Sequence, residues 1–392
     1  MSDHIPFEIQ TEIIKNLPVI SLIRFRSVSK SWKSLIDSSE FIVNYHVNCS
    51  RLQHNLFVRY IDAQELYEWN LEDENYLSIV DDDTFPQNWF PLIVPTSVKQ
   101  LGRLPLMVGT SQGLFSFYNT PVGSNRHKEM TVVIWNPTID KSVSVVVPNV
   151  FRNYPLDTVV GFGVCPLTMD PMLVKITYSS SCLYNMIMCI PFQVEIFTLS
   201  SGIWRSSSNN MPRKSLTLSR DQASLDRFIY WLATDRIPKT EGDGYDLNNM
   251  ILSFDMISEE FADIYLPDSL ARLGNCSLTI SELRTSLVVL EINMVGEKRE
   301  YCVWKMKHGV PNSFKKLFVF KAPDTSPLNI HRVIGFRKTG EPMIDILYDS
   351  DERNALVVYD PDSDRINYIG IYGVGFPYLA TSYMETLLLH NY

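Results

Sequence analysis

The hydrophobic positions near the N-terminus recur at the spacing of an α-helix. Pro6 is suited to the first position of such a helix, because the N–H that it lacks has no partner there. Pro18 marks the other end, since the residue before a proline is disfavoured in the helical conformation. The apolar stripe of this helix consists of Ile5, Ile9, Ile13, Ile14 and Leu17.

A second apolar set follows at spacings of three and four residues, so further helices are expected after Pro18. Ser38 and Ser39 then offer side-chain oxygens that can cap the start of a last short helix. We therefore expect three or four short helices within about fifty residues. The second set is Leu22, Phe25, Val28, Trp32, Leu35 and Ile36, and the last helix carries Phe41, Ile42 and Tyr45.

This helical module has more apolar positions than its own core can hide. A domain of fewer than roughly 60 residues buries little surface and is marginally stable alone. Some of its apolar side chains must therefore face a partner protein or the rest of the chain. The pattern leaves both possibilities open: a helical cap packed on the next domain, or a docking module for another protein.

Beyond this module the pattern changes to short runs of Val, Ile and aromatic residues, broken by Asn, Asp, Ser, Gly and Pro. Such a texture is typical of many short antiparallel strands. One aromatic position recurs where an apolar strand enters a turn, at intervals of 50 to 66 residues. Its instances are Trp69, Trp135, Phe197, Phe254, Trp304 and Tyr359.

A further hairpin lies between successive aromatic positions, so each repeat supplies four strands. Four strands in each of these repeats predict a β-propeller of about six to seven kelch-like blades. A single blade cannot bury its own faces, so the blades bury them by packing against one another. The first blade is expected to share strands with the C-terminal end, and the recurring aromatic to be a packing residue. The predicted fold is multidomain α+β, with a helical domain over residues 1–47 and an all-β propeller over residues 54–390.

The net charge of −9 has a local origin between Asp62 and Asp83. Nine acidic residues and no basic residue lie there, and the rest of the chain has 35 acidic residues against 35 basic ones. We expect this acidic run to be a solvated hairpin edge. A basic face for nucleic acid is not indicated. Neither a secretory signal nor an apolar run of membrane length is found, so a cytoplasmic or nuclear protein is expected.

Few residues of this chain suggest catalysis. Gly109–Gly113 matches the G-x-S-x-G elbow of hydrolases, but a strand-like run follows it where that motif needs a helix. We therefore expect Ser111 to lie in a hairpin turn. Gly161 and Gly163 are interpreted as letting an inner strand pass close to the propeller axis. No histidine pair has ligand spacing, so neither a metal site nor a cofactor is expected.

The N-terminal helices resemble the F-box, the module by which substrate receptors dock on the Skp adaptor of SCF-type (cullin–RING) ubiquitin ligases. Three positions depart from the plant pattern: Ile5 replaces Leu, Ile20 stands where Lys is common, and Ser29 replaces Cys. The resemblance is carried by Ile5-Pro6, Glu8, Ile13-Ile14, Leu17-Pro18, Ser21-Leu22, Arg24-Phe25, Val28, Lys30, Trp32, Leu35-Ile36 and Phe41.

The remaining chain, from about Leu101 to Leu389, resembles the plant F-box-associated interaction domain, type 1. Ser111-Gln112 replaces the usual Cys-Asn before Gly113-Leu114. The resemblance implies a non-catalytic substrate receptor whose propeller captures a protein for ubiquitination. Its motifs are Gly109 to Phe117, Ile134 to Thr138, Val160 to Gly163, Val194 to Phe197, Trp231 to Ala233, Ile251 to Asp255, Trp304 to Met306, and Tyr359-Asp360.

Two kinds of contact site follow from these resemblances. Candidate substrate loops are Val122–Lys128, Asn149–Tyr154 and Arg236–Tyr245, while the substrate and its contact residues stay unknown. Two other functions stay open: an F-box scaffold acting outside a ligase, and a propeller enzyme, which would need an axial polar cluster. The residues expected to bind the Skp-type adaptor are Ile5, Pro6, Ile9, Ile13, Leu17, Pro18, Leu22, Val28 and Trp32.

Overall fold

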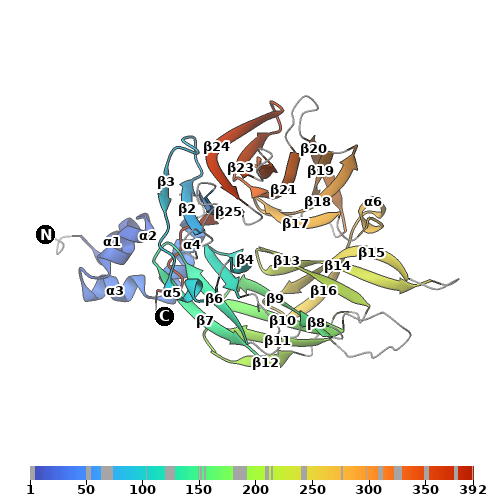
Figure 1. Cartoon of the computed structure of the whole chain (residues 1–392). Coiled ribbons are helices and arrows are strands. Elements are labelled where there is room, and N and C mark those ends of the chain that lie inside the picture. The colour runs from blue at the N-terminus through green and yellow to red at the C-terminus, as the bar shows by residue number, and fades with distance from the viewer. Residues whose placement is uncertain are drawn as a thin grey trace.

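A computed structural model of the protein shows a group of helices beside a ring of β-sheets (Figure 1). Four helices precede six sheets among the residues that the model describes. The described residues are 5–49, 54–62, 74–102, 104–119, 129–148, 150, 152–153, 156–179, 192–207, 212, 215–239, 245–274, 277–296, 298–307, 312–321, 329–347, 353–374, 378–390 and 392.

The first and last helices begin where the sequence predicts. Pro6 and Pro18 are the N-caps of the first two helices, and Ser29 caps the third by accepting a hydrogen bond from the N–H of Trp32. The Ser38 hydroxyl accepts a hydrogen bond from the N–H of Phe41, which confirms it as a cap of the fourth. The helices are α1 (Phe7–Ile14), α2 (Val19–Phe25), α3 (Lys30–Ile36) and α4 (Ser39–Cys49).

The helical module has a small core to which the C-terminal end of the chain contributes. Leu387 is 1% exposed and packs among the helices. The Tyr45 hydroxyl donates a hydrogen bond to the Leu17 carbonyl oxygen at 2.7 Å, which ties α4 to the turn before α2. The buried helical members of this core are Ile14, Val19, Leu22, Ile36, Phe41 and Tyr45.

Each β-sheet is one blade of a propeller, and adjacent strands of each blade are antiparallel. Blade 1 contains β25 (Leu379–Met384), β1 (His54–Ile61), β2 (Glu74–Val80) and β3 (Trp89–Pro91). Blade 2 contains β4 (Leu106–Ser111), β5 (Leu114–Tyr118), β6 (Met130–Asn136) and β7 (Lys141–Val147). Blade 3 contains β8 (Arg152–Asn153), β9 (Leu156–Val164), β10 (Pro171–Ser179), β11 (Gln193–Thr198) and β12 (Trp204–Ser207).

The other three blades have four strands each. Blade 4 contains β13 (Leu216–Leu225), β14 (Phe228–Pro238), β15 (Tyr245–Asp255) and β16 (Glu260–Tyr265). Blade 5 contains β17 (Leu278–Leu283), β18 (Ser286–Val295), β19 (Lys298–Met306) and β20 (Phe314–Lys321). Blade 6 contains β21 (Asn329–Phe336), β22 (Pro342–Leu347), β23 (Arg353–Asp360) and β24 (Arg365–Val374). Two short helices, α5 (Thr96–Lys99) and α6 (Asp268–Ala271), lie between blades.

The ring is closed by a strand from the C-terminal end. Strand β25 pairs with β1, with Leu56 opposite Ser382, and so completes blade 1. Inner strands contact those of neighbouring blades, for example β4 with β9, β13 with β9 and β17, and β21 with β25. The sharing of the first blade with C-terminal strands is confirmed, and the described residues form six blades.

The recurring aromatic is a packing residue in the described repeats. It lies on β6, β11, β15, β19 and β23, which are the last but one strands, in chain order, of blades 2 to 6. Trp135 and Phe254 are fully buried, whereas Trp304 is half-buried beneath the ammonium group of Lys316. Trp69 lies outside the described residues.

Two sequence interpretations need correction. Gly161 and Gly163 lie on the inner strand β9, but the close contact is with the neighbouring blade: a Cβ on Gly161 would lie 2.2 Å from Trp231 Cζ2. The acidic run is not wholly solvated, because Asp81 is fully buried and its Oδ1 lies 2.7 Å from Nη2 of Arg337. This ion pair joins blade 1 to blade 6, and its Arg337 partner is far away in sequence.

Candidate functional site

The N-terminal stripe is an exposed apolar row on the helical module. The exposed fractions are 44% for Ile5, 52% for Ile9 and 52% for Ile13. Pro6 is exposed beside them. Because side chains four residues apart share a helix face, this row runs along α1 on the side away from the buried Ile14. An exposed row of this kind is typical of a protein interaction site.

The other predicted docking residues divide between surface and core. Val28 is 63% exposed and Pro18 is exposed, so both can contact a partner. Leu17 and Trp32 are half-buried against the core of the helical module. The Trp32 Nε1–H donates a hydrogen bond to Gln10 Oε1 at 2.9 Å, which holds the indole against α1.

The placement of Leu22 differs from the prediction. Its side chain is fully buried between the helices, so Leu22 supports the docking surface from within and offers no surface of its own. The reason is the size of the module, whose few helices need the inward face of α2 to build a core. Sequence reasoning also missed Phe7 and Ile20, which are 45% and 49% exposed.

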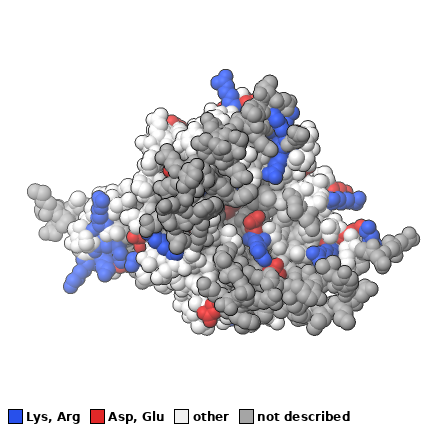
Figure 2. Space-filling model, in the orientation of Figure 1, with Lys and Arg blue, Asp and Glu red and all other residues white. Residues whose placement is uncertain are grey.

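Charged side chains of both signs surround the exposed row, since Glu8 and Glu12 are exposed on α1 itself. Figure 2 shows Lys and Arg side chains gathered over the helical module next to uncharged surface. Arg24, Lys30 and Lys33 are exposed on α2 and α3. Exposed charges of one sign steer the approach of a partner of opposite charge more than they add to the final affinity.

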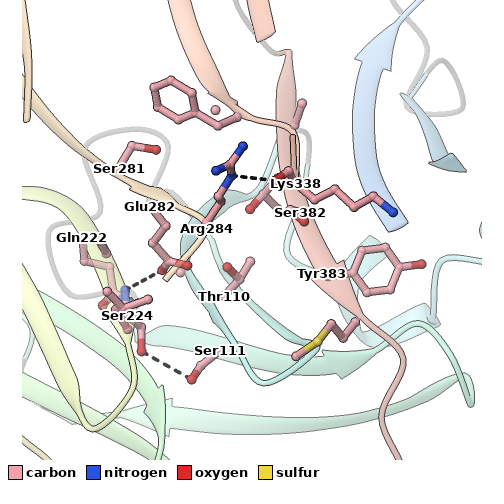
Figure 3. Close-up of a pocket in the computed structure, with 18 of the residues that line it drawn as sticks. Thr110, Ser111, Gln222, Ser224, Ser281, Glu282, Arg284, Lys338, Ser382 and Tyr383 are labelled. Carbon is pink, nitrogen blue, oxygen red and sulfur yellow. Dashed lines mark hydrogen bonds between the residues drawn. The ribbon is translucent and has the colours of Figure 1, made fainter. Parts of the chain in front are cut away.

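A cavity of about 860 Å³ lies at one end of the propeller (Figure 3). It is lined by the turns that join first and second strands in blades 2, 4, 5 and 6, which places these turns at the same end. His54 and Met384, the first residue of β1 and the last of β25, also line it. Because α4 precedes β1, the helical module joins the propeller at this end.

Polar groups from four blades are linked at this cavity. The N–H of Ser224 donates a hydrogen bond to Glu282 Oε1 at 2.8 Å, and the Ser224 hydroxyl lies 3.3 Å from the Ser111 hydroxyl (Figure 3). The Ser111 oxygen also accepts a hydrogen bond from the N–H of Val164 at 3.0 Å. Burial raises the pKa of Glu282 to about 7, and the negative charge of Asp226 adds to the rise against the lowering effect of the Ser224 N–H.

Ser111 is not a hydrolase nucleophile. Gln112 and Gly113, with φ of 50° and 79°, form the turn between β4 and β5, so no helix follows the serine. This confirms the hairpin interpretation of the Gly109–Gly113 motif. The Ser111 hydroxyl joins blades 2, 3 and 4, which is a structural role.

Among the residues that the structure describes, no three His, Cys, Asp or Glu side chains come together in a way that would hold a metal ion. No helix in the described part of the chain combines the length and apolar character that a membrane crossing requires.

The described strands that flank the three loops predicted to contact substrate end on the side of the propeller opposite the cavity. The loops join β5 to β6, β7 to blade 3, and β14 to β15. Val122–Lys128 lies outside the described residues, as do parts of Asn149–Tyr154 and Arg236–Tyr245. The described ends of the β14–β15 hairpin are apolar and exposed, with Ile237 at 45% and Leu247 at 38%.

Comparison with known families agrees with the two-part architecture. Residues 2–44 match the F-box domain, and residues 124–379 match the F-box associated beta propeller domain. The chain belongs to the F-box-associated β-propeller family. It is an F-box protein with a six-bladed propeller among its described residues.

Relatives of this F-box protein include F-box proteins of Arabidopsis thaliana. Putative F-box protein At1g47790 is 27% identical over 36% of this chain and 33% of its own length. F-box protein At4g11590 is 38% identical over 30% of this chain and 29% of its own length. The chain thus spans about a third of these two relatives. F-box protein CPR1 is 22% identical over 98% of this chain and 89% of its own length.

Proposed function

We propose that this F-box protein is the substrate-recognition subunit of an SCF ubiquitin ligase. Its F-box would dock on a Skp-type adaptor, and through it on a cullin–RING ligase, while the propeller captures a protein for ubiquitination. The single observation that carries the proposal is the exposed row of Ile5, Ile9 and Ile13 on a helical module whose inward face is buried in a core. The subunit itself is proposed to be non-catalytic and to need no cofactor.

The exposed row suits docking into an apolar groove. A helix that presents residues four positions apart can bury one continuous face in such a groove. A few aliphatic anchors at the centre of an interface carry most of its affinity. Ile9 and Ile13 are the most exposed residues of this row, each at 52%, so we expect these two isoleucines to dominate.

Substrate capture is proposed for the end of the propeller opposite the cavity. The β14–β15 and β18–β19 hairpins reach this end and carry exposed apolar side chains, including Met294 at 64% and Val295 at 49%. A rigid ring can present variable loops at its rim. Ubiquitin transfer would then be promoted by proximity, because the receptor holds substrate lysines near the loaded conjugating enzyme.

Adaptor docking is tested by the double substitution Ile9→Ser and Ile13→Ser. Both side chains are exposed, so the change removes apolar contacts while leaving the core intact. We expect the affinity of the full chain for a purified Skp-type adaptor, measured by calorimetry, to fall by about a hundredfold or more. Leu167→Ser is the matched control, because Leu167 is 67% exposed on the propeller.

Unchanged adaptor affinity in the double variant would show that docking does not use this row. Adaptor binding without recruitment of a cullin would favour the other function considered for this chain, an F-box scaffold acting outside a ligase.

A further inference from the structure

The C-terminal end of the chain returns to the F-box after closing the propeller ring. Strand β25 ends at Met384, and the next residues run along the helical module. Leu387 inserts between the helices and is 1% exposed, so it belongs to the F-box core although 337 residues lie between it and the end of α4. A core of this size has few members, so each buried leucine contributes a large share of its stability.

Two titratable residues of this segment also contact the F-box. Glu385 accepts a hydrogen bond from the N–H of Val19, the first residue of α2; burial raises the pKa of Glu385 and this bond opposes the rise. The His390 ring is 3% exposed, and its Nε2 lies 3.3 Å from Oδ1 of Asp37. Asp37 also receives a bidentate contact from Arg26, with Nε–Oδ1 at 2.5 Å and Nη2–Oδ2 at 3.0 Å.

The propeller holds the same segment from the other side. Asn136, at the end of β6, is fully buried, and its Nδ2 donates hydrogen bonds to the carbonyl oxygens of Thr386 and Leu388 at 2.9 and 2.7 Å. Leu388 and Leu389 are buried in the apolar cluster between blades 2 and 3. Some residues of the segment contact the F-box and others contact the propeller, so the segment is anchored in both domains.

Helix α4 lies at the same junction. Ile42 packs against both the F-box core and the cluster between blades 2 and 3. Ile139, in the turn between β6 and β7, packs against the F-box core as well. The two domains therefore share a continuous apolar contact, which the C-terminal segment fills.

We propose that residues 385–390 are a positioning part of the adaptor-docking module: they complete the F-box core and fix its orientation on the propeller. The consequence for ubiquitin transfer rests on the proposed function. The structural claim does not, because it concerns only contacts within the chain. A fixed orientation keeps the adaptor end and the substrate end at a constant separation, as catalysis by proximity requires.

The test is hydrogen exchange on the full chain without adaptor, comparing wild type with Leu387→Ala. We expect the α2 amides to exchange about tenfold faster or more in the variant, because a buried leucine is removed beside α2. The β22 and β23 amides should keep their protection, which shows that the propeller is folded. Leu387→Met preserves the apolar volume and should restore α2 protection.

Leu356→Ala is the matched control, since Leu356 is a fully buried leucine in blade 6. It should lower protection in blade 6 and leave α2 unchanged. Small-angle scattering should show a larger radius of gyration for Leu387→Ala than for wild type, because the F-box is no longer held in place. Unchanged α2 protection in Leu387→Ala, or faster α2 exchange in Leu356→Ala of the same size, would overturn the proposal.

Adaptor affinity gives a separate readout. Leu387→Ala should weaken adaptor binding about tenfold through loss of F-box order, whereas Ile9→Ser with Ile13→Ser should abolish binding without changing α2 exchange. If wild type does not bind the adaptor, the proposed function fails, and the exchange result still decides the positioning role.

Discussion

At the scale of single residues, the face of a helix decides whether an apolar side chain serves the fold or a partner. Ile13 and Ile14 are neighbours in sequence, yet their exposed fractions are 52% and 2%. One residue corresponds to a rotation of about 100° around a helix, so the two side chains point to different sides. Hydrophobicity alone does not separate these roles, which is why Leu22 was wrongly placed on the docking surface.

Glu282 gives a pH-dependent prediction at the same scale. Its pKa in the folded protein is about 7 against an ordinary 4.5, so the folded state binds the proton more tightly than the unfolded state. The free energy of unfolding must then fall as the pH rises from 4.5 to about 7. Glutamine keeps the acceptor for the Ser224 N–H without a titrating group. Glu282→Gln should therefore gain about 2 kcal/mol of stability relative to wild type between pH 5 and pH 8.

Urea unfolding of both proteins at the two pH values measures this change. The negative charge of Asp226 contributes to the raised pKa of Glu282, so Asp226→Asn should lower that pKa and reduce the slope of wild-type stability with pH. A stability difference between Glu282→Gln and wild type that stays constant over pH would contradict the assignment.

At the scale of elements, the period of the hydrophobic pattern and the spacing of the recurring aromatic residues predicted most of the architecture. The Ser38 cap, the recurring strand-end aromatics and the sharing of blade 1 all followed from local patterns. Contacts between blades did not, because they join residues far apart in sequence. The Gln222 side chain is one example: its amide pairs with both the N–H and the carbonyl oxygen of Phe162, each at 2.7 Å.

Gly161 supplies the prediction for this scale. A methyl group there would collide with Trp231 of blade 4, so Gly161→Ala should lower the free energy of unfolding by about 2–3 kcal/mol. Gly274→Ala is the control, because a Cβ at Gly274 would have no heavy atom within 4 Å. Denaturant unfolding measures both variants. Equal stabilities for the two would mean that blades 3 and 4 are not packed as tightly as described.

At the scale of the whole molecule, the N-terminal and C-terminal parts of the chain are in contact at two places. Strand β25 closes the propeller ring beside β1, and the residues after it complete the F-box core. The sequence shows that the helical module has more apolar residues than its own core can hide. It does not show that Leu387, from the other end of the chain, packs against some of them. The remaining surplus, on the exposed face of α1, is the part left for a partner.

The most direct test of the receptor function is affinity purification of the full chain under proteasome inhibition, followed by mass spectrometry. Three forms are compared: wild type, the docking variant Ile9→Ser with Ile13→Ser, and a capture-end variant Ile237→Ser with Leu247→Ser. Wild type should retain an adaptor, a cullin and a set of proteins whose abundance rises with the inhibitor. The docking variant should lose the adaptor and cullin but keep that set, and the capture-end variant should show the reverse. Absence of adaptor and cullin from wild type, or their retention by the docking variant, would contradict the account.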